Sequence, residues 1–162
     1  MQDTAAEDSF MRRAIALSER AMTEGTGLPF GAVIVRGNQV VAEGYNRVYA
    51  TNDPTAHAEI VAIRLACEAA GSPVLEGCTI YSSSEPCPMC LAAIYWAGIG
   101  RVIYANDLAA AAVAGFGDAR LYREIALPAE SRTIPMAQHL AAEAKPVFDV
   151  WQARAVNAGP GP

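Results

Sequence analysis

The chain has 162 residues, the length of one compact domain. Hydrophobic residues make up 52% of it and charged residues 18%, a composition that can bury a core and that excludes a wholly disordered chain. Seventeen acidic and twelve basic residues give a net charge of −5. This excess of acidic residues argues against a protein whose main function is to bind the phosphate backbone of a nucleic acid.

The predicted elements begin with a helix over about residues 9–24, where apolar side chains recur at helical spacing. Two short apolar stretches near 30–35 and 40–42 flank a polar turn and predict a hairpin. Asp53 and Pro54 have the pattern of an N-cap followed by proline at the first helical position, so a second helix is predicted from there to Gly71.

A strand at 79–82, a helix over 86–97 and a strand at 101–104 follow with short connections. Such alternation predicts parallel pairing in a layered α/β sheet. Further helices are expected over 108–114, 118–125 and 146–157, and the Gly- and Pro-rich residues 159–162 are expected to be a disordered tail.

The N-terminal residues carry acids early and have no apolar core region, so we expect no secretory signal. Charged residues and glycines interrupt every apolar stretch before it could span a bilayer, so we expect no membrane partner and a cytoplasmic location. Four cysteines in such a chain indicate metal binding or catalysis before disulfides.

The sequence His57-Ala58-Glu59 and the sequence Pro86-Cys87-Pro88-Met89-Cys90 each stand at a predicted helix start, with a strand between them. Cys87 and Cys90 are three residues apart, so both sulfurs can meet one ion on the same side of the first turn. With a neutral His57 imidazole they make three protein ligands for a tetrahedral zinc whose fourth position is left to water or hydroxide, which is typical of catalytic zinc. Glu59 can then take the proton of that water.

Other interpretations of the cysteine pair are a structural zinc site or a redox motif. A structural site would need a second C-x-x-C pair, but Cys67 and Cys78 match no ligand spacing, and a redox motif needs no H-x-E sequence upstream. The combination of H-x-E with P-C-x-x-C is the signature of zinc deaminases that act on nucleobases. In that chemistry zinc hydroxide attacks the amino-bearing ring carbon, and Glu59 would shuttle the proton to the departing amine.

The chain resembles the cytidine deaminase-like superfamily and, within it, the bacterial guanine deaminases. The resemblance covers most of residues 29–135. It implies a three-layer α/β/α fold with a central mixed five-stranded sheet flanked by helices. The similar segments are Pro29–Val35, Thr51–Ile60, Glu85–Ala97, Ala114–Asp118, Tyr122–Ile125 and Pro128–Pro135.

By position, the resemblance implies a substrate pocket to which the zinc-ligating His57 also contributes. Phe30 and Trp96 would supply flat walls for stacking, although ordinary core packing explains either of them equally well. Asn46 offers a donor and an acceptor to one edge of a purine, and Asp118 could accept a hydrogen bond from the ring or relay a second proton, as well as cap a helix. The implied residues are Phe30, Asn46, Ala58, Trp96 and Asp118 for the substrate, and Glu59 and Asp118 for catalysis.

Residues 1–158 are therefore expected to form a single zinc-dependent deaminase domain. The resemblance also implies a homodimer in which the segment at about 128–158 crosses to the partner subunit. Phe148 and Trp151 fit the start of the C-terminal part that would cover the partner's active site. The last four residues contain no aromatic side chain to close the pocket. Guanine is the expected substrate. Guanosine, cytosine and ammeline remain open, and deamination of adenosine in tRNA is a further alternative.

Overall fold

The computed structural model describes residues 4–158, with side chains described as far as Arg154. Contacts divide the chain into two compact units, one up to Tyr122 and one from Arg123 onward, and each is described by itself. The expected disordered tail at 159–162 lies outside the described residues.

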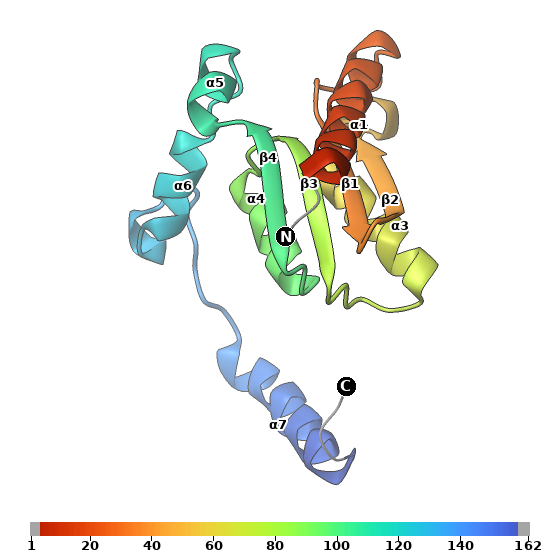
Figure 1. Ribbon diagram of the computed structural model, residues 1–162. Coiled ribbons are helices and arrows are strands. Elements are labelled where there is room, and N and C mark those ends of the chain that lie inside the picture. The colour runs from red at the N-terminus through yellow and green to blue at the C-terminus, as the bar shows by residue number, and fades with distance from the viewer. Residues whose placement is uncertain (1–3, 159–162) are drawn as a thin grey trace. The chain divides into compact units, whose positions relative to one another are not determined.

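The first unit is built on a mixed sheet with the strand order β2-β1-β3-β4 (Figure 1). β1 (Gly31–Arg36) pairs antiparallel with both β2 (Gln39–Tyr45) and β3 (Cys78–Ser84), and β3 pairs parallel with β4 (Arg101–Asn106). The predicted mixed α/β sheet is confirmed, but its strand number is four within residues 4–158, not five. The reason lies after β4, where the chain enters the alanine-rich helix α5 (Leu108–Val113) and offers no further β-branched stretch.

Helices cover both faces of this sheet, which confirms the three-layer arrangement (Figure 1). Alternate residues of β1 point to opposite faces, as a strand requires. Val33 and Val35 pack with α1 (Thr4–Thr23), while Ala32 and Ile34 belong to the cluster beneath α3 (Ala58–Ala70) and α4 (Pro88–Trp96).

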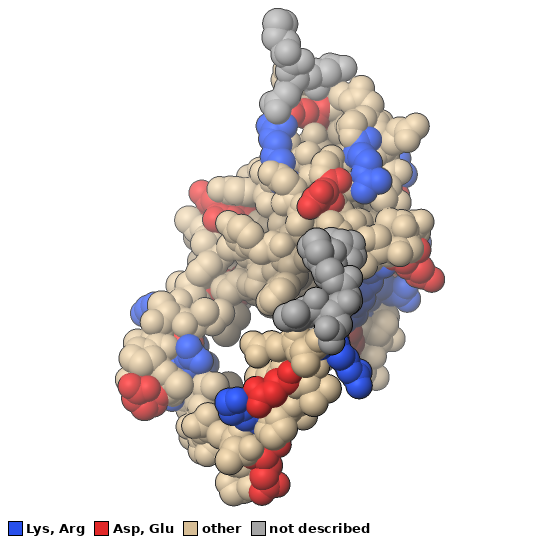
Figure 2. All heavy atoms as spheres, turned by 90° about the horizontal axis from the view of Figure 1, so that it is seen from below, with Lys and Arg blue, Asp and Glu red and all other residues tan. Residues whose placement is uncertain are grey.

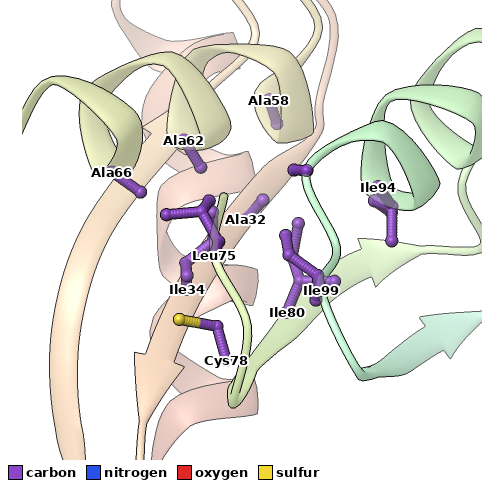
Figure 3. Close-up of a cluster of buried hydrophobic side chains, with 11 residues drawn as sticks. Ala32, Ile34, Ala58, Ala62, Ala66, Leu75, Cys78, Ile80, Ile94 and Ile99 are labelled. Atoms are coloured by element: carbon purple, nitrogen blue, oxygen red, sulfur yellow. The ribbon is translucent and has the colours of Figure 1, made fainter. Parts of the chain in front are cut away.

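Small residues bring α3 close to the sheet. Ala58, Ala62 and Ala66 form its buried face and lie against Ile34 of the sheet (Figure 3). On β2 a Cβ at Gly44 would lie 2.3 Å from the carbonyl oxygen of Ala58, a distance that only glycine permits. The first turn of α3 is therefore fixed against the sheet.

The start of α3 differs from the prediction. The Asp53 carboxylate accepts hydrogen bonds from the backbone N–H and the hydroxyl of Thr55, at 2.8 and 2.6 Å, and so closes a local turn and caps no helix. A short helix, α2 (Val48–Thr51), precedes this turn. The N-cap of α3 is His57, which moves the helix start directly to the predicted zinc ligand.

The remaining helices are α6 (Ala119–Ala126), which spans the boundary between the units, the single 3₁₀ turn η1 (Ala129–Ser131) and α7 (Ala141–Ala158). The last helix was predicted to begin at Pro146, but Pro146 lies inside α7. The helix begins earlier because Leu140, with a φ of 52°, turns the chain and its carbonyl accepts from the N–H groups of Glu143 and Ala144. Among the residues that the structure describes, none of the helices has the length and apolarity needed to cross a membrane.

Candidate metal and substrate site

Two helix starts bring the predicted zinc ligands together. His57 is the N-cap of α3, Cys87 is the N-cap of α4, and Cys90 lies in the first turn of α4. One nitrogen of His57 and the two sulfurs all lie within 4.8 Å of one another. The Nδ1 atom of His57 is 3.6 Å from the Sγ atom of Cys87 and 3.6 Å from the Sγ atom of Cys90.

This donor set fits zinc. In a tetrahedral site with ordinary zinc–nitrogen and zinc–sulfur bonds, a nitrogen and a sulfur ligand lie about 3.6 Å apart. The two measured distances between His57 and the cysteine sulfurs agree with that edge. A set of one imidazole and two thiols also favours zinc over magnesium or calcium, which prefer oxygen. The three side chains would therefore hold one zinc ion and leave its fourth position open.

The Cys87 thiol is prepared for a cation. The hydrogen bond from Cys90, with a further contribution from that of His57, lowers the pKa of Cys87 to about 4. The hydrogen bond with the Cys87 sulfur raises the pKa of His57, and the same partner raises the pKa of Cys90. Cys87 is thus a thiolate at neutral pH, at a helix N-terminus that stabilises negative charge.

Glu59 is a buried carboxylate beside these ligands. Its side chain is only 6% exposed, and burial raises the pKa of its carboxyl group. Oε2 lies 3.4 Å from the Cys90 sulfur, and Oε1 accepts a hydrogen bond of 3.2 Å from the hydroxyl of Ser82. A carboxyl group in this position can accept and hold a proton next to the metal ligands, the property that general acid–base catalysis requires.

A cavity of about 370 Å³ opens onto this group, a volume typical of a pocket for a small molecule. Its walls include Phe30, whose ring meets that of Phe116 edge to face with centroids 5.1 Å apart. Asp118 lies at the same cavity, and burial raises the pKa of its carboxyl group. The other lining residues are Leu28, His57, Glu59, Ser84, Glu85, Cys87, Ala111, Gly115, Gly117 and Leu121.

Phe116 was not predicted as a site residue, although its segment was part of the family resemblance. It stands between two glycines, and Gly115 has a φ of 92°, which a larger residue rarely adopts. An apolar ring between such residues in a loop could have indicated a wall residue, since a loop residue with no regular periodicity has no other evident packing role.

The other predicted substrate residues are placed differently. Asn46 is fully buried, and its Oδ1 atom accepts from the N–H groups of Leu28 and Val48, while its Nδ2 atom has no partner in the described residues. Ala58 belongs to the core cluster, and Trp96, at the end of α4, is 88% exposed. These three residues do not line the cavity. Their contacts with a substrate therefore stay predictions.

The family of the chain follows from comparison with known proteins. The model for the cytidine and deoxycytidylate deaminase zinc-binding region matches residues 4–106, which hold all three candidate ligands and Glu59. The chain belongs to this family. Membership in the cytidine and deoxycytidylate deaminase family confirms a zinc-binding deaminase domain, and the structure places a matching donor set at its centre.

Three relatives illustrate the range of this deaminase family. The guanine deaminase of Bacillus subtilis is 49% identical over 145 residues, which are 90% of this chain and 93% of the relative. Its crystal structure matches with a TM-score of 0.88 and covers 91% of this chain and 94% of that one.

A guanine deaminase structure from Nitrosomonas europaea matches at 27% identity with a TM-score of 0.65, covering 68% of this chain and 64% of that one. The tRNA-specific adenosine deaminase of Agrobacterium fabrum is 46% identical over 95 residues, which are 59% of this chain and 62% of the relative. The cytidine deaminase-like fold is thereby confirmed for this chain.

Proposed function

We propose that this zinc-dependent aminohydrolase converts guanine and water into xanthine and ammonia. The observation that carries the choice of guanine is the likeness to the Bacillus subtilis guanine deaminase, which extends over 90% of this chain. The likeness to the tRNA-specific enzyme of Agrobacterium fabrum extends over 59%. Residues outside the shared zinc-binding region are thus similar to those of the guanine deaminase.

His57, Cys87 and Cys90 would hold the zinc ion, which when bound acts as a Lewis acid and lowers the pKa of a water molecule to near neutrality. Glu59 transfers the proton. Its carboxylate accepts a proton as water is added to the amino-bearing carbon and returns it to the amine, which leaves as ammonia. The raised pKa of the buried Glu59 suits both halves of this transfer.

Binding of the purine would use the walls of the cavity. The rings of Phe30 and Phe116 offer apolar surface to a flat base, and Asp118 could accept from a ring N–H or relay a second proton. Asn46 does not line the cavity, so a contact between its buried Nδ2 donor and a purine acceptor rests on the family resemblance. The family resemblance adds the backbone N–H of Ala58 and the ring of Trp96.

We further propose a homodimer in which the segment at about 128–158 crosses to the partner subunit and residues 1–158 act as one deaminase domain. Support comes from apolar side chains that the described chain leaves in solvent. On α7, Val147, Phe148 and Trp151 are between 68% and 72% exposed. Pro146, Val147, Val150, Trp151 and Arg154 line an apolar groove on the same helix, which the surface of a second copy could fill.

A cytoplasmic location is part of the same proposal. The zinc site needs reduced thiols, and all four cysteines of the chain are free in the structure. A reducing compartment keeps such thiols available to the metal.

Deamination of adenosine in tRNA is the second candidate, and the 46% identity to the Agrobacterium fabrum enzyme favours it. Two observations count against it. The net charge is −5, and the chain has a single lysine, Lys145. On the face shown in Figure 2, acidic and basic side chains are interspersed among uncharged ones. Tight binding of tRNA would need a concentrated basic surface.

The test is ammonia release from guanine, guanosine, adenine, cytosine, cytidine and ammeline at equal concentration, with the zinc-loaded protein. We expect ammonia and xanthine from guanine, loss of both after treatment with a chelator, and their return when zinc is added back. Turnover of another ring with guanine left unchanged would contradict the proposed substrate. If none of the six compounds releases ammonia and tRNA binds in a salt-sensitive way in a gel shift, deamination of adenosine in tRNA would be favoured.

A further inference from the structure

The Glu59 carboxylate has one neighbour that the reaction scheme leaves unused, the hydroxyl of Ser82. This hydroxyl donates to Oε1 at 3.2 Å, while the Cys90 sulfur lies 3.4 Å from Oε2. Both partners are buried, with Ser82 1% exposed. A hydrogen bond to a charged group inside a protein is stronger than one at the surface, so this contact has the strength to orient the carboxylate.

Zinc binding would change the contact of Glu59 with Cys90 but not its contact with Ser82. A cysteine that ligates a metal is a thiolate and carries no proton, so Cys90 cannot donate to Glu59 in the loaded enzyme. The hydroxyl of Ser82 is not a zinc ligand and keeps its proton in either state. Of these two side chains, Ser82 is therefore the one that can donate a hydrogen bond to the Glu59 carboxylate while the metal is bound.

The backbone of Ser82 is well placed for this task. It lies in β3, an inner strand, where it pairs with Ala32 of β1 on one side and with Tyr104 of β4 on the other. A side chain on a strand bonded at both edges has a fixed origin, which a site on a loop would lack. Glu59 comes from α3, so the hydrogen bond joins the helix that carries the carboxylate to the centre of the sheet.

The neighbouring serines make other contacts. Ser83 accepts a hydrogen bond of 3.0 Å from the backbone N–H of Gly31, and the hydroxyl of Ser84 lies 3.5 Å from the carbonyl oxygen of Asn106. All three serines are buried on one strand. Ser83 is thus a matched comparison for Ser82, since it offers one buried side-chain hydrogen bond that does not reach Glu59.

We propose that Ser82 is a positioning residue for deamination, whose hydroxyl holds the Glu59 carboxylate in the orientation that transfers the proton. This inference rests on the proposed role of Glu59. It concerns the maximal rate of the chemical step and not the affinity for substrate, because Ser82 does not line the cavity whereas Glu59 does.

The experiment compares wild type, Ser82→Ala, Ser82→Thr and Ser83→Ala, all loaded with zinc. We expect Ser82→Ala to lower kcat about 10-fold or more, with KM changed less than about 2-fold and zinc content unchanged. Ser82→Thr keeps the hydroxyl and is expected to restore kcat to within about 3-fold of wild type. Ser83→Ala is expected to lower Tm as much as Ser82→Ala does but to leave kcat within about 2-fold.

Two results would overturn the proposal: an unchanged kcat in Ser82→Ala, or an equal loss of kcat in Ser82→Ala and Ser83→Ala. Crystal structures of zinc-loaded wild type and Ser82→Ala provide a readout that does not depend on the substrate. The carboxylate of Glu59 is expected to change its orientation in the variant, and an unmoved, ordered carboxylate would also refute the positioning role. Failure of the wild type to deaminate guanine would instead contradict the substrate proposed above.

Discussion

The two compact units of the chain differ in whether they bury an apolar core. Up to Tyr122, isoleucines, valines and alanines fill clusters on both faces of the sheet, as Ile34 and Ile80 do between the sheet and α3. From Arg123 onward the large apolar side chains lie in solvent, with Ile134 at 74% and Trp151 at 70% exposed. Exposure on that scale normally marks an interface, because burying each such side chain is worth about 1.5–3 kcal/mol.

The two units also differ in the functional residues that they contain. The first unit contains the candidate ligands His57, Cys87 and Cys90, the carboxylate Glu59 and the whole described lining of the cavity. The second unit contributes none of these described groups, and its helix α7 offers an apolar groove. We therefore expect chemistry to respond to substitutions in the first unit and assembly to respond to substitutions in the second.

The largest effect is expected from Glu59→Gln in the first unit. Glutamine keeps the size of the side chain but cannot take a proton, so kcat is expected to fall about 10²–10⁴-fold. Zinc content and oligomeric state should stay as in wild type, because Glu59 is neither a predicted ligand nor part of the second unit. Activity assays with metal analysis and sedimentation velocity measure all three quantities.

A suitable control is Glu43→Gln, which removes a carboxylate paired with Arg13 at the surface and is expected to leave kcat within about 2-fold. Retained turnover in Glu59→Gln, or loss of zinc from it, would show that the carboxylate has another role.

A pair of charges on α7 tests the second unit. Val147→Asp with Trp151→Asp would place two carboxylates in the apolar groove. If a second copy fills that groove, association is expected to weaken at least about 30-fold, because truncating an interfacial anchor typically costs about 2 kcal/mol or more. Sedimentation velocity should show dimers for wild type and for Gln152→Ala, but monomers for the double variant. If the wild type is a monomer at micromolar concentration, the proposal that the second unit forms a dimer interface is wrong.

How much the sequence could predict follows the same division. The zinc ligands and Glu59 are coded by short local motifs at helix starts. Spacing predicted that Cys87 and Cys90 meet, and the combination with the H-x-E motif added His57 and Glu59. The hairpin of β1 and β2 and the parallel pairing of β3 with β4 were also predictable, from the polar turn and from the short connection through α4. The antiparallel pairing of β1 with β3 was not predicted. The start of α3 was predicted wrongly because the Asp53 carboxylate accepts hydrogen bonds from Thr55 and does not cap the helix.

The cavity wall was harder to predict. The family resemblance implied Phe30 as a wall residue, but Phe116 meets Phe30 only through the tertiary fold, and the glycines beside Phe116 were its one local signal. Trp96 is 88% exposed in the described chain, and its stacking role stays a prediction of the family resemblance. Side-chain contacts made across long loops depend on packing that no local periodicity encodes.

Within the first unit, Gly44→Ala tests whether the close approach of β2 and α3 supports the metal site. The new Cβ would lie 2.3 Å from the carbonyl oxygen of Ala58, so the start of the helix must shift. We expect the free energy of unfolding to fall by about 1–3 kcal/mol, with weaker zinc binding. The control Gly100→Ala meets its nearest atom at 3.9 Å and should change stability by less than about 0.5 kcal/mol. Equal effects of the two substitutions would argue against this account.

The smallest effect is expected at the aromatic wall of the cavity. Phe116→Leu keeps an apolar side chain but removes the ring that meets Phe30 edge to face. Because an aromatic contact between this ring and the base would contribute about 0.5–1.5 kcal/mol beyond its buried area, KM for guanine is expected to rise about 5-fold with little change in kcat. Phe10→Leu is the matched control, since Phe10 packs on Tyr81 at the opposite face of the sheet and should leave KM unchanged. If Phe116→Leu lowers kcat and leaves KM unchanged, the ring supports the reacting groups and does not serve as a binding surface for the base.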